Sequence, residues 1–379
     1  MTTHEKKSIL VINTGSSSVK FQLFLQHPEL PLLAKGQIAN LGTHPFFVAT
    51  TETDSLISSE VVEQEVPANC THETAIGHIL HWLKSQKQIG QISVVAHRVV
   101  HGASEFISSV LITPDVLCRL RTLIPLAPLH QAHSLAAIKM TSTLMPDVMQ
   151  IACFDTAFHA HHEPLFSEYA LPRKMRDKGI RRYGFHGLSY EWIVYSLRQS
   201  EPQLASGRII AAHLGNGASL CAIDNGLSID TTMGMTAIDG LPMGSRCGAL
   251  DPGVVIYMLR ELGLSADEIE SMLYKESGLL GLSEWTNDVS LLQHSEEPKA
   301  QFAFNYFCLR VAQFMGMMAA ALGGVDGIVF TGGIGEHSEV GRDKIVHRLA
   351  FLKPFEIRII PANEERIMAM HSISLMEQM

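Results

Sequence analysis

The chain has 379 residues, of which 46% are hydrophobic and 18% charged, a profile typical of a globular α/β protein. Its length exceeds one ordinary core and suits two domains of roughly 150 to 200 residues each, which leaves room for a cleft between two lobes. A net charge of −9 disfavours a nucleic-acid groove, because phosphate backbones are bound by concentrated Lys and Arg.

The cysteines and the amino-terminal residues favour a cytoplasmic protein. The six cysteines contain no CxxC pair, which predicts reduced thiols in cores rather than a metal-thiolate site. The opening segment, MTTHEKKSIL, holds no apolar signal core, so we expect no targeting segment and no membrane anchor.

Residues 8–26, SILVINTGSSSVKFQLFLQ, predict a β-hairpin with a turn of small residues. Such a turn lets the backbone N–H groups and the hydroxyls of Ser16 and Ser18 approach phosphate oxygens, and Lys20 adds a positive charge. A plain hairpin turn explains the same residues, since Gly and Ser dominate turns in general.

Two further segments predict buried strands that end in polar residues, at positions suited to active-site groups. Residues 92–102, ISVVAHRVVHG, contain Arg98, and residues 149–159, MQIACFDTAFH, contain Asp155. Another arginine, Arg246, lies in the glycine-flanked loop MGSRCGALDPG. The planar guanidinium suits carboxylate or phosphate oxygens, although a structural ion pair remains an equal alternative for each arginine.

The run HAHH at residues 159–162 invites a metal-site interpretation. Adjacent His161 and His162 cannot share one helix face, and Glu163 is the one nearby acid at ligand spacing. A structural or solvated loop is therefore the better interpretation of this run.

Residues 208–226, RIIAAHLGNGASLCAIDNG, repeat the strand, turn and strand pattern of the first hairpin and indicate a duplicated fold. Residues 304–322 are apolar but interrupted by Asn305, Arg310 and Gln313, which predicts a buried helix rather than a membrane span. Residues 327–349 predict a strand, a glycine-rich turn and a helix.

Three loops of small residues together suggest a nucleotide clamp. They are the turn of the first hairpin, the turn HLGNG at residues 213–217 and the turn TGGIGE at residues 331–336. The chain contains no GxxxxGK[ST] motif and no HRD or DFG set, so P-loop and protein-kinase architectures are disfavoured.

The motifs INTGSSSVKF, AHRVVHG, APLHQAHSL, FDTAFH, RRYGFHGLS, HLGNGASL, MGSRCGALDP, SGLLGLSE, FTGGIGEHSE and IPANEE follow one another in this order. Together they closely resemble those of the acetokinase family, which comprises acetate, propionate and butyrate kinases. The resemblance spans residues 9 to about 370 and is far more specific than any single loop.

The resemblance implies two similar actin-like, ribonuclease H-like lobes, each with a mixed five-stranded sheet flanked by helices, and a cleft between them. The expected lobes are residues 1–152, with a carboxy-terminal helix at about 365–379 packing back on them, and residues 153–364. It also implies reversible transfer of the ATP γ-phosphoryl group to acetate, Mg²⁺ with Mn²⁺ as an alternative, ATP and ADP as co-substrates, and a homodimer.

By motif position, the resemblance implies that Asn13 and Glu364 bind the metal and that Lys20 contacts the nucleotide. It implies that Arg98 and Arg246 bind the substrate carboxylate and the transferring phosphoryl group. The remaining implied roles are a transition-state donor (His186), an essential acid (Asp155), a pocket for the alkyl end of the acid (Val100, Leu129, Phe185) and a nucleotide site (His213, Leu214, Gly215, Asn216, Gly217, Asp288, Gly333, Ile334, Gly335, Glu336, His337).

The sequence departs from the family pattern at several positions. Ala237 stands where Pro is common in the acyl pocket, and a smaller side chain there admits a longer acid such as propionate. The other departures are Gln131, Ala132 and His133 in place of Asn-Pro-Ala, Ala249 in place of Asp, Ser290 in place of Arg and His337 in place of Asn.

A small carboxylic acid has a pKa of about 4 and is already deprotonated at neutral pH, so the reaction needs no strong base. We therefore expect direct in-line transfer, with Asp155 orienting the metal, a water molecule or Arg98 rather than removing a proton. The alternatives are a propionate or butyrate kinase, a non-catalytic ATP-binding protein of the actin type, and a metal-binding structural protein built on HAHH.

Overall fold

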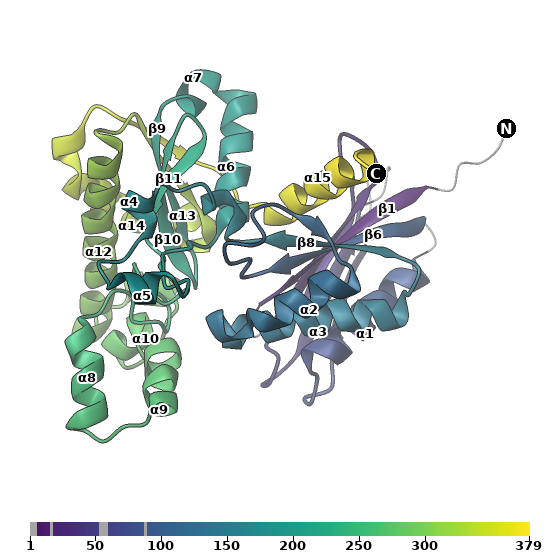
Figure 1. The fold of residues 1–379 in the computed structure, drawn as a ribbon, viewed down its shortest axis with the longest axis horizontal. Helices are drawn as coiled ribbons and strands as arrows, with labels where there is room; N and C mark the ends of the chain where they lie inside the picture. The colour runs from purple at the N-terminus through teal and green to yellow at the C-terminus, as the bar shows by residue number, and fades with distance from the viewer. Residues whose placement is uncertain (1–5, 16–17, 53–59, 87–88) are drawn as a thin grey trace. The chain divides into compact units, whose positions relative to one another are not determined.

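The computed structural model describes residues 6–15, 18–52, 60–86 and 89–379. The chain forms two compact units (Figure 1). Unit 1 comprises Met1–Ala157 and Asn363–Met379, and unit 2 comprises Phe158–Ala362. Each unit is built on its own mixed sheet flanked by helices, which confirms the expected α/β class.

The sheet of unit 1 has the strand order β5-β4-β3-β2-β1-β6-β8-β7. Strands β1 to β5 form an antiparallel meander, whereas β6 runs parallel to both β1 and β8. The strands are β1 (Lys7–Thr14), β2 (Val19–Leu25), β3 (Leu32–Ala39), β4 (Phe46–Thr51), β5 (Glu60–Glu65), β6 (Gln91–Val99), β7 (Val110–Leu111) and β8 (Met149–Phe154).

The predicted first hairpin is confirmed, because Asn13 pairs with Lys20 and Thr14 with Val19 across β1 and β2. The eight-stranded sheet is larger than the five strands that the resemblance implies. The meander continues into β3, β4 and β5, short strands in which polar residues such as Lys35, Thr50 and Glu63 stand among the apolar ones.

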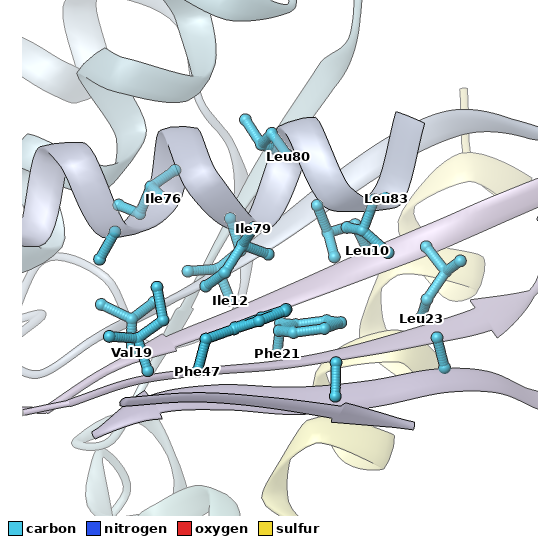
Figure 2. Packing of buried hydrophobic residues seen from close by; sticks show 14 of the residues in the cluster. Leu10, Ile12, Val19, Phe21, Leu23, Phe47, Ile76, Ile79, Leu80 and Leu83 are labelled. Atoms are coloured by element: carbon cyan, nitrogen blue, oxygen red, sulfur yellow. The ribbon is translucent and has the colours of Figure 1, made fainter. Parts of the chain in front are cut away.

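Helices cover both faces of this sheet. Helices α1 (His72–Ser85) and α3 (Pro128–Leu144) pack together on one face, with α2 (Pro114–Thr122) beside α3, and α15 (Glu364–Glu377) contacts β1 and β6 on the other face (Figure 1). Under α1, the buried side chains of Ile76, Ile79 and Leu83 meet those of Phe21 and Phe47 (Figure 2). Each such buried apolar side chain contributes about 1.5 to 3 kcal/mol to folding.

The sheet of unit 2 has the order β11-β10-β9-β12-β13. The second predicted hairpin is confirmed, since Leu214 pairs with Ala218 at the tight end of β9 and β10. Strand β12 is parallel to β9 and β13. The strands are β9 (Arg208–Leu214), β10 (Ala218–Asp224), β11 (Leu227–Thr231), β12 (Gly327–Thr331) and β13 (Glu356–Ile359).

Two helices cover the two faces of this second sheet. Helix α6 (Gly187–Ser200) packs on β9, and α12 (Pro298–Leu322) packs on β9, β10 and β11 (Figure 1). Helix α12 is the predicted buried helix, and no helix in the described part of the chain is long and apolar enough to cross a membrane.

The remaining helices of unit 2 are short. They are α4 (Pro164–Ser167), α5 (Arg173–Arg176), α7 (Pro202–Ala205), α8 (Pro252–Arg260), α9 (Ala266–Ser271), α10 (Gly278–Ser283), α11 (Val289–His294), α13 (Gly332–His337) and α14 (Glu339–Arg348).

Candidate active site

Arg98 and Asp155 lie at the carboxyl ends of two adjacent parallel strands of unit 1. Strand β6 ends at Val99 and β8 at Phe154, so their last polar residues meet at one edge of the sheet. Arg98 donates from Nε to Asp155 Oδ1 at 2.8 Å and from Nη2 to Oδ2 at 2.5 Å. The Asp155 side chain is 2% exposed and that of Arg98 18%, so this is a mostly desolvated, two-pronged ion pair.

Asn13 joins this pair from the end of β1. Arg98 Nη1 donates to Asn13 Oδ1 at 3.1 Å, and Asn13 Nδ2 donates to Glu365 Oε1 at 2.9 Å. Glu365 belongs to the first turn of α15, the helix that contacts β1 and β6. The ends of β1, β6 and β8 and the start of α15 therefore assemble one polar cluster, here called the arginine cluster: Asn13, Arg98, Asp155, Glu364 and Glu365.

The arginine cluster carries more carboxylates than its buried arginine can neutralise. Burial raises the pKa of Glu364, as do Asp155 and Glu365, while Arg98 and Lys20 oppose the rise, and the result is about 7. Burial alone lowers the pKa of Arg98, but the carboxylates of Asp155 and Glu364 raise it well above its ordinary value. Arg98 is therefore permanently charged, whereas burial and the neighbouring carboxylates favour the protonated form of Glu364.

This donor set suits a hard divalent cation. Carboxylate and amide oxygens are the protein ligands that Mg²⁺ prefers, and its remaining positions are usually filled by water and substrate phosphates. In the described part of the chain, no group of three or more His, Cys, Asp or Glu side chains converges as a complete metal cage. The arginine cluster therefore offers carboxylate and amide oxygens to a cation without forming a complete protein cage.

Other expected residues of unit 1 lie near this edge. Lys20 is exposed and pairs in register with Asn13, and Gly15 N donates to Ser18 O at 2.8 Å within the hairpin turn. Val100 follows β6 directly and is buried. Ser16 lies outside the described residues, as does the side chain of Leu129.

His186 is the first expected residue of unit 2, and it precedes α6. It adopts a left-handed backbone conformation with φ 57° and ψ 22°, which is strained for a non-glycine residue. Its ring is buried, with Nδ1 2.8 Å from Ser219 Oγ, and that hydroxyl also bonds to Tyr190 OH. The His186 ring stacks on His213, with ring centroids 4.2 Å apart.

Gly217 separates His186 from Arg246. A Cβ added at Gly217 would lie 3.3 Å from His186 Nε2 and 3.8 Å from Arg246 Nη1. Arg246 Nη1 also donates to the carbonyl of Ala237 at 3.0 Å. The absent side chain thus keeps open a space bordered by an imidazole nitrogen and a guanidinium group, and a phosphoryl group fits the chemistry of both.

The loop at residues 213–217 joins β9 to β10. His213 Nδ1 lies 2.9 Å from Ser189 Oγ, Leu214 is buried, and Gly215 N donates to Gly217 O at 3.0 Å. The exposed Asn216 accepts a hydrogen bond from Gly244 N at its carbonyl, 3.1 Å away, which ties this loop to the Arg246 loop. The second predicted loop therefore lies beside both His186 and Arg246.

The third glycine loop, residues 331–336, is stabilised in part by hydrogen bonds to its own glutamate. Gly332 is left-handed with φ +79°, and Glu336 Oε1 accepts from the N–H groups of Gly332 and Ala362, each at 3.0 Å. Gly333 and His337 are exposed, Ile334 is half-buried and Gly335 is buried. Glu336 therefore stabilises the loop, and exposed surface for a nucleotide remains at residues 333, 334 and 337.

The two remaining expected residues of unit 2 are Asp288 and Phe185. Asp288 caps α11, accepting from Ser290 N at 2.8 Å, and is exposed. Phe185 is fully buried and precedes His186.

Several residues that complete these clusters escaped the sequence reasoning. Glu365 adjoins Glu364 in IPANEE, and Tyr190 follows His186 by four residues, one helical turn, so both had a local signal. Ser219 had none, because its role depends on the register of β10. Nothing in the sequence around Ser189 predicted its contact with His213 either.

The unusual residues of APLHQAHSL are accommodated by specific contacts. Gln131 is buried and bonds the backbone of His101 twice, accepting from its N at 3.1 Å and donating to its O at 3.0 Å. His133 stacks on His72, with ring centroids 4.0 Å apart, and burial followed by the charge of His72 lowers its pKa. His72 Nε2 in turn lies 2.8 Å from Gly15 O.

The HAHH run is split by the fold. His159 and His162 are buried and His161 is exposed, so the run is a structural element and not a wholly solvated loop.

Comparison with known proteins gives a consistent result. A family model described as the acetokinase family matches residues 8–369. An acetate kinase of Rhodopseudomonas palustris (strain TIE-1) is 46% identical over 348 residues, covering 91% of this chain and 86% of that protein. An acetate kinase of Methylocella silvestris is 41% identical over 400 residues, covering 98% of this chain and 99% of the relative.

Solved structures agree with the sequence comparison. The crystal structure of Porphyromonas gingivalis acetate kinase matches with a TM-score of 0.85 and 34% identity, covering 98% of this chain and 100% of that one. A propionate kinase from Francisella tularensis matches with a TM-score of 0.89 and 35% identity, covering 96% and 98%. These structures have the actin-like ATPase fold that the sequence predicts. The chain is a member of the acetokinase family.

Proposed function

We propose that this protein is an acetate kinase, which reversibly transfers the γ-phosphoryl group of ATP to acetate and forms acetyl phosphate and ADP. The observation that carries the proposal is the acetokinase match over residues 8–369, combined with intact Arg98, Asp155, His186 and Arg246 in ordered polar clusters. The named relatives at 41% to 46% identity are acetate kinases.

The main obstacle to this reaction is repulsion between an anionic carboxylate and a polyanionic phosphate. In a dry site this repulsion costs several kcal/mol unless positive charge is supplied. Arg98 and Arg246 supply that charge. Because acetate is deprotonated at neutral pH, the attack is direct and in line, and no phosphoenzyme is required.

Arg98 is preorganised to hold the acid. Three of its five N–H groups bond Asp155 and Asn13, which fixes the guanidinium plane and leaves two for substrate oxygens. Asp155 therefore acts as an orienting anion for Arg98. Burial of the pair keeps its charge from being screened by water.

His186 and Arg246 act on the transferring phosphoryl group. His186 Nδ1 lies 2.8 Å from Ser219 Oγ, which also bonds Tyr190 OH; in the tautomer that serves the transfer, Ser219 donates to Nδ1 and the imidazole proton resides on Nε2. This nitrogen faces Gly217, as does Arg246 Nη1. Both groups then donate to the equatorial oxygens as charge develops there.

Glu364 and Asn13 would hold Mg²⁺, which would neutralise phosphate charge, and Mn²⁺ would fit the same oxygens. Glu364 supplies a carboxylate whose raised pKa reflects excess negative charge in the arginine cluster. Lys20 and Ser18, from the turn of the first hairpin, contact the nucleotide. The loop at residues 213–217, with Asp288 and residues 333–337, holds the rest of it.

Propionate is the second candidate substrate. Ala237 replaces a bulkier proline of the family pattern, its side chain is half-buried, and a propionate kinase is among the structural matches. Val100, Leu129 and Phe185 would bind the alkyl end. One extra methylene in such a pocket changes discrimination by about 10-fold to 200-fold.

One experiment separates these substrates. The purified chain is incubated with Mg²⁺, ATP and acetate, propionate or butyrate, and the acyl phosphate is trapped as hydroxamate. We expect the largest kcat/KM with acetate, a smaller value with propionate and loss of product when the metal is chelated. ADP release that is independent of any acid would instead support an actin-type ATPase and contradict the proposal. Sedimentation analysis tests the expected homodimer.

A further inference from the structure

Unit 2 contains a buried hydrogen-bonded chain that the reaction does not directly use. His159 Nδ1 lies 2.7 Å from Ser228 Oγ, and His162 Nε2 lies 2.6 Å from the same oxygen. His159 Nε2 lies 3.0 Å from the carbonyl oxygen of Phe185. Cys221 Sγ also contacts Ser228 Oγ, at 3.2 Å. Both histidines and the serine are buried.

The chemistry of the partners fixes the direction of the three hydrogen bonds that join His159, His162, Ser228 and the Phe185 carbonyl. The Phe185 carbonyl can only accept, so His159 carries its proton on Nε2 and presents a lone pair at Nδ1. Ser228 must then donate its hydroxyl hydrogen to His159 Nδ1. With that hydrogen used, His162 donates from Nε2 to Ser228 Oγ, which leaves His162 Nδ1 as a lone pair.

Two independent features agree with this assignment. His162 Nδ1 is buried without a hydrogen-bond partner in the described part of the chain, which is tolerable for a lone pair and costly for an N–H group. Burial lowers the pKa of His159 to about 4 and, with His159 and the neighbouring arginines, that of His162 to about 3. Both rings are therefore neutral at pH 7, and each carries one proton.

His159 bonds to the carbonyl oxygen of Phe185, and the peptide group of that carbonyl leads into His186. The peptide plane between Phe185 and His186 rotates about φ of His186, so a hydrogen bond to the Phe185 oxygen fixes that angle. His186 has φ 57°, a value that L-residues adopt only when the surroundings enforce it. The His159 ring also packs on Gly184, where an added Cβ would lie 2.6 Å from His159 Cδ2.

The side chain of His186 is fixed separately. Ser219 and Tyr190 hold its Nδ1 edge, and the Tyr190 ring makes an edge contact with His159 at 5.7 Å between centroids. His186 is therefore restrained at two points, its backbone by His159 and its ring by Ser219. Both restraints act on the residue whose Nε2 would lie 3.3 Å from a Cβ added at Gly217.

We propose that His159 is a positioning residue for His186, and that the chain His162–Ser228–His159 selects the His159 tautomer that donates to the Phe185 carbonyl. The proposal rests on the proposed function, in which His186 donates to the transferring phosphoryl group. The HAHH run then serves phosphoryl transfer through hydrogen bonds. A metal role is disfavoured because His159 uses both ring nitrogens in hydrogen bonds, and the lone pair at His162 Nδ1 by itself makes no metal site.

A matched pair of variants tests this role. His159→Gln places an amide N–H near the former Nε2 position and retains a donor for the Phe185 carbonyl, whereas His159→Asn is too short to reach it. His161→Asn, at the exposed histidine of the same run, is the control. We expect His159→Asn to lower kcat roughly 10-fold to 100-fold with KM values for ATP and acetate within about twofold, because the buried His159 acts through the backbone of His186.

Rescue by the conservative variant distinguishes positioning from general stabilisation. His159→Gln should return kcat to within about threefold of the parent, and His161→Asn should match it. In a His186→Ala background, His159→Asn should lower kcat by less than about twofold further, because the two residues act as one unit. Equal losses in the Gln and Asn variants, or a full additional loss without His186, would overturn the role of His159.

The tautomer can be measured in the parent protein without any substitution. Nitrogen-15 NMR of the labelled imidazoles should show His159 neutral at pH 7 with its proton on Nε2, and Ser228→Ala should increase exchange between its two tautomers. A proton on Nδ1 of His159 would contradict the proposed hydrogen-bond directions among His162, Ser228 and His159, even if every variant misfolded. If the parent forms no acyl phosphate, the proposed function fails. If His159 has the expected tautomer but His159→Asn lowers kcat fully even without His186, only the positioning role is overturned.

Discussion

Arg98 donates two parallel hydrogen bonds to Asp155, from Nε at 2.8 Å and from Nη2 at 2.5 Å. The pair joins the ends of the parallel strands β6 and β8, and a third bond, from Nη1 to Asn13 Oδ1, extends it to β1. Because Asp155 uses both oxygens on one arginine, its geometry is that of an orienting anion.

The first prediction concerns this ion pair. Asp155→Asn keeps the shape of the side chain but removes the charge that orients Arg98, so we expect kcat to fall roughly 10²-fold. The pH–rate profile of the residual activity should keep the shape of the parent profile, because no base is lost. Hydroxamate kinetics between pH 6 and 8 measure both. A new dependence on hydroxide in the variant would instead assign Asp155 as a general base.

The second prediction concerns Arg246. Arg246→Ala removes a guanidinium group from the space beside Gly217 and should lower turnover by around 10³-fold. Arg260→Ala, at an exposed arginine of α8, is the matched control and should leave turnover unchanged. Near-normal acyl phosphate formation by Arg246→Ala would remove this residue from the mechanism.

The third prediction tests the space itself. Gly217→Ala adds a Cβ that would lie 3.3 Å from His186 Nε2, so it should lower kcat/KM for ATP roughly 10-fold or more. The backbone there is not left-handed, so thermal stability should change little. Gly316→Ala in α12 is the control, since its added Cβ meets no atom within 4 Å. Unchanged kinetics in Gly217→Ala would place the phosphoryl group elsewhere.

The fourth prediction concerns substrate length. Ala237→Pro restores the side chain of the family pattern while keeping the carbonyl that accepts from Arg246 Nη1. We expect the ratio of kcat/KM for acetate to that for propionate to rise roughly ten-fold, the value of about one methylene. Competition assays with both acids measure it, and a constant ratio would refute the assignment of Ala237 to the acyl pocket.

The fifth prediction concerns acid stability. Burial lowers the pKa of His97 to about 4, although its hydrogen bond to Gln150 opposes the shift, whereas an unfolded histidine titrates near 6.5. Between these values the unfolded chain binds the extra proton, so the free energy of unfolding falls as the pH falls from about 6.5 to about 4. The contribution of one histidine is at most about 1.4 kcal/mol per pH unit.

His97→Gln should reduce that pH dependence. The amide retains a donor toward Gln150 Oε1, which His97 Nε2 contacts at 2.8 Å, but it does not titrate. Denaturant titrations at pH 6.5 and 4.5 should show a shallower loss of stability in the variant than in the parent. An identical slope in both proteins would show that His97 is not a buried neutral group.

Local sequence patterns were sufficient to predict part of the secondary structure. Both hairpins, the strands before Arg98 and Asp155, and helix α12 were predicted, because a buried strand and a buried helix impose alternation or continuous hydrophobicity on their own residues. Strands β3 to β5 were not predicted: they are short, and polar residues interrupt their apolar runs.

The partners of the site residues were mostly invisible in the sequence. Glu365 bonds Asn13 from 352 positions away, and Ser228 joins His159 and His162 from 69 and 66 positions away. No local pattern encodes such distances, because they depend on strand register and on which helix end reaches which sheet edge.

The sequence alone determined the α/β class, the two hairpins and the family, since these follow from ordered motifs and from side-chain periodicity. Tertiary structure decided that Asp155 bonds Arg98 with both carboxylate oxygens, that Glu336 accepts hydrogen bonds within its own loop and that the buried histidines of HAHH bond to Ser228. The physical reason is that hydrogen-bond direction, desolvation and pKa depend on the atoms packed around a side chain, and those atoms come from distant parts of the chain.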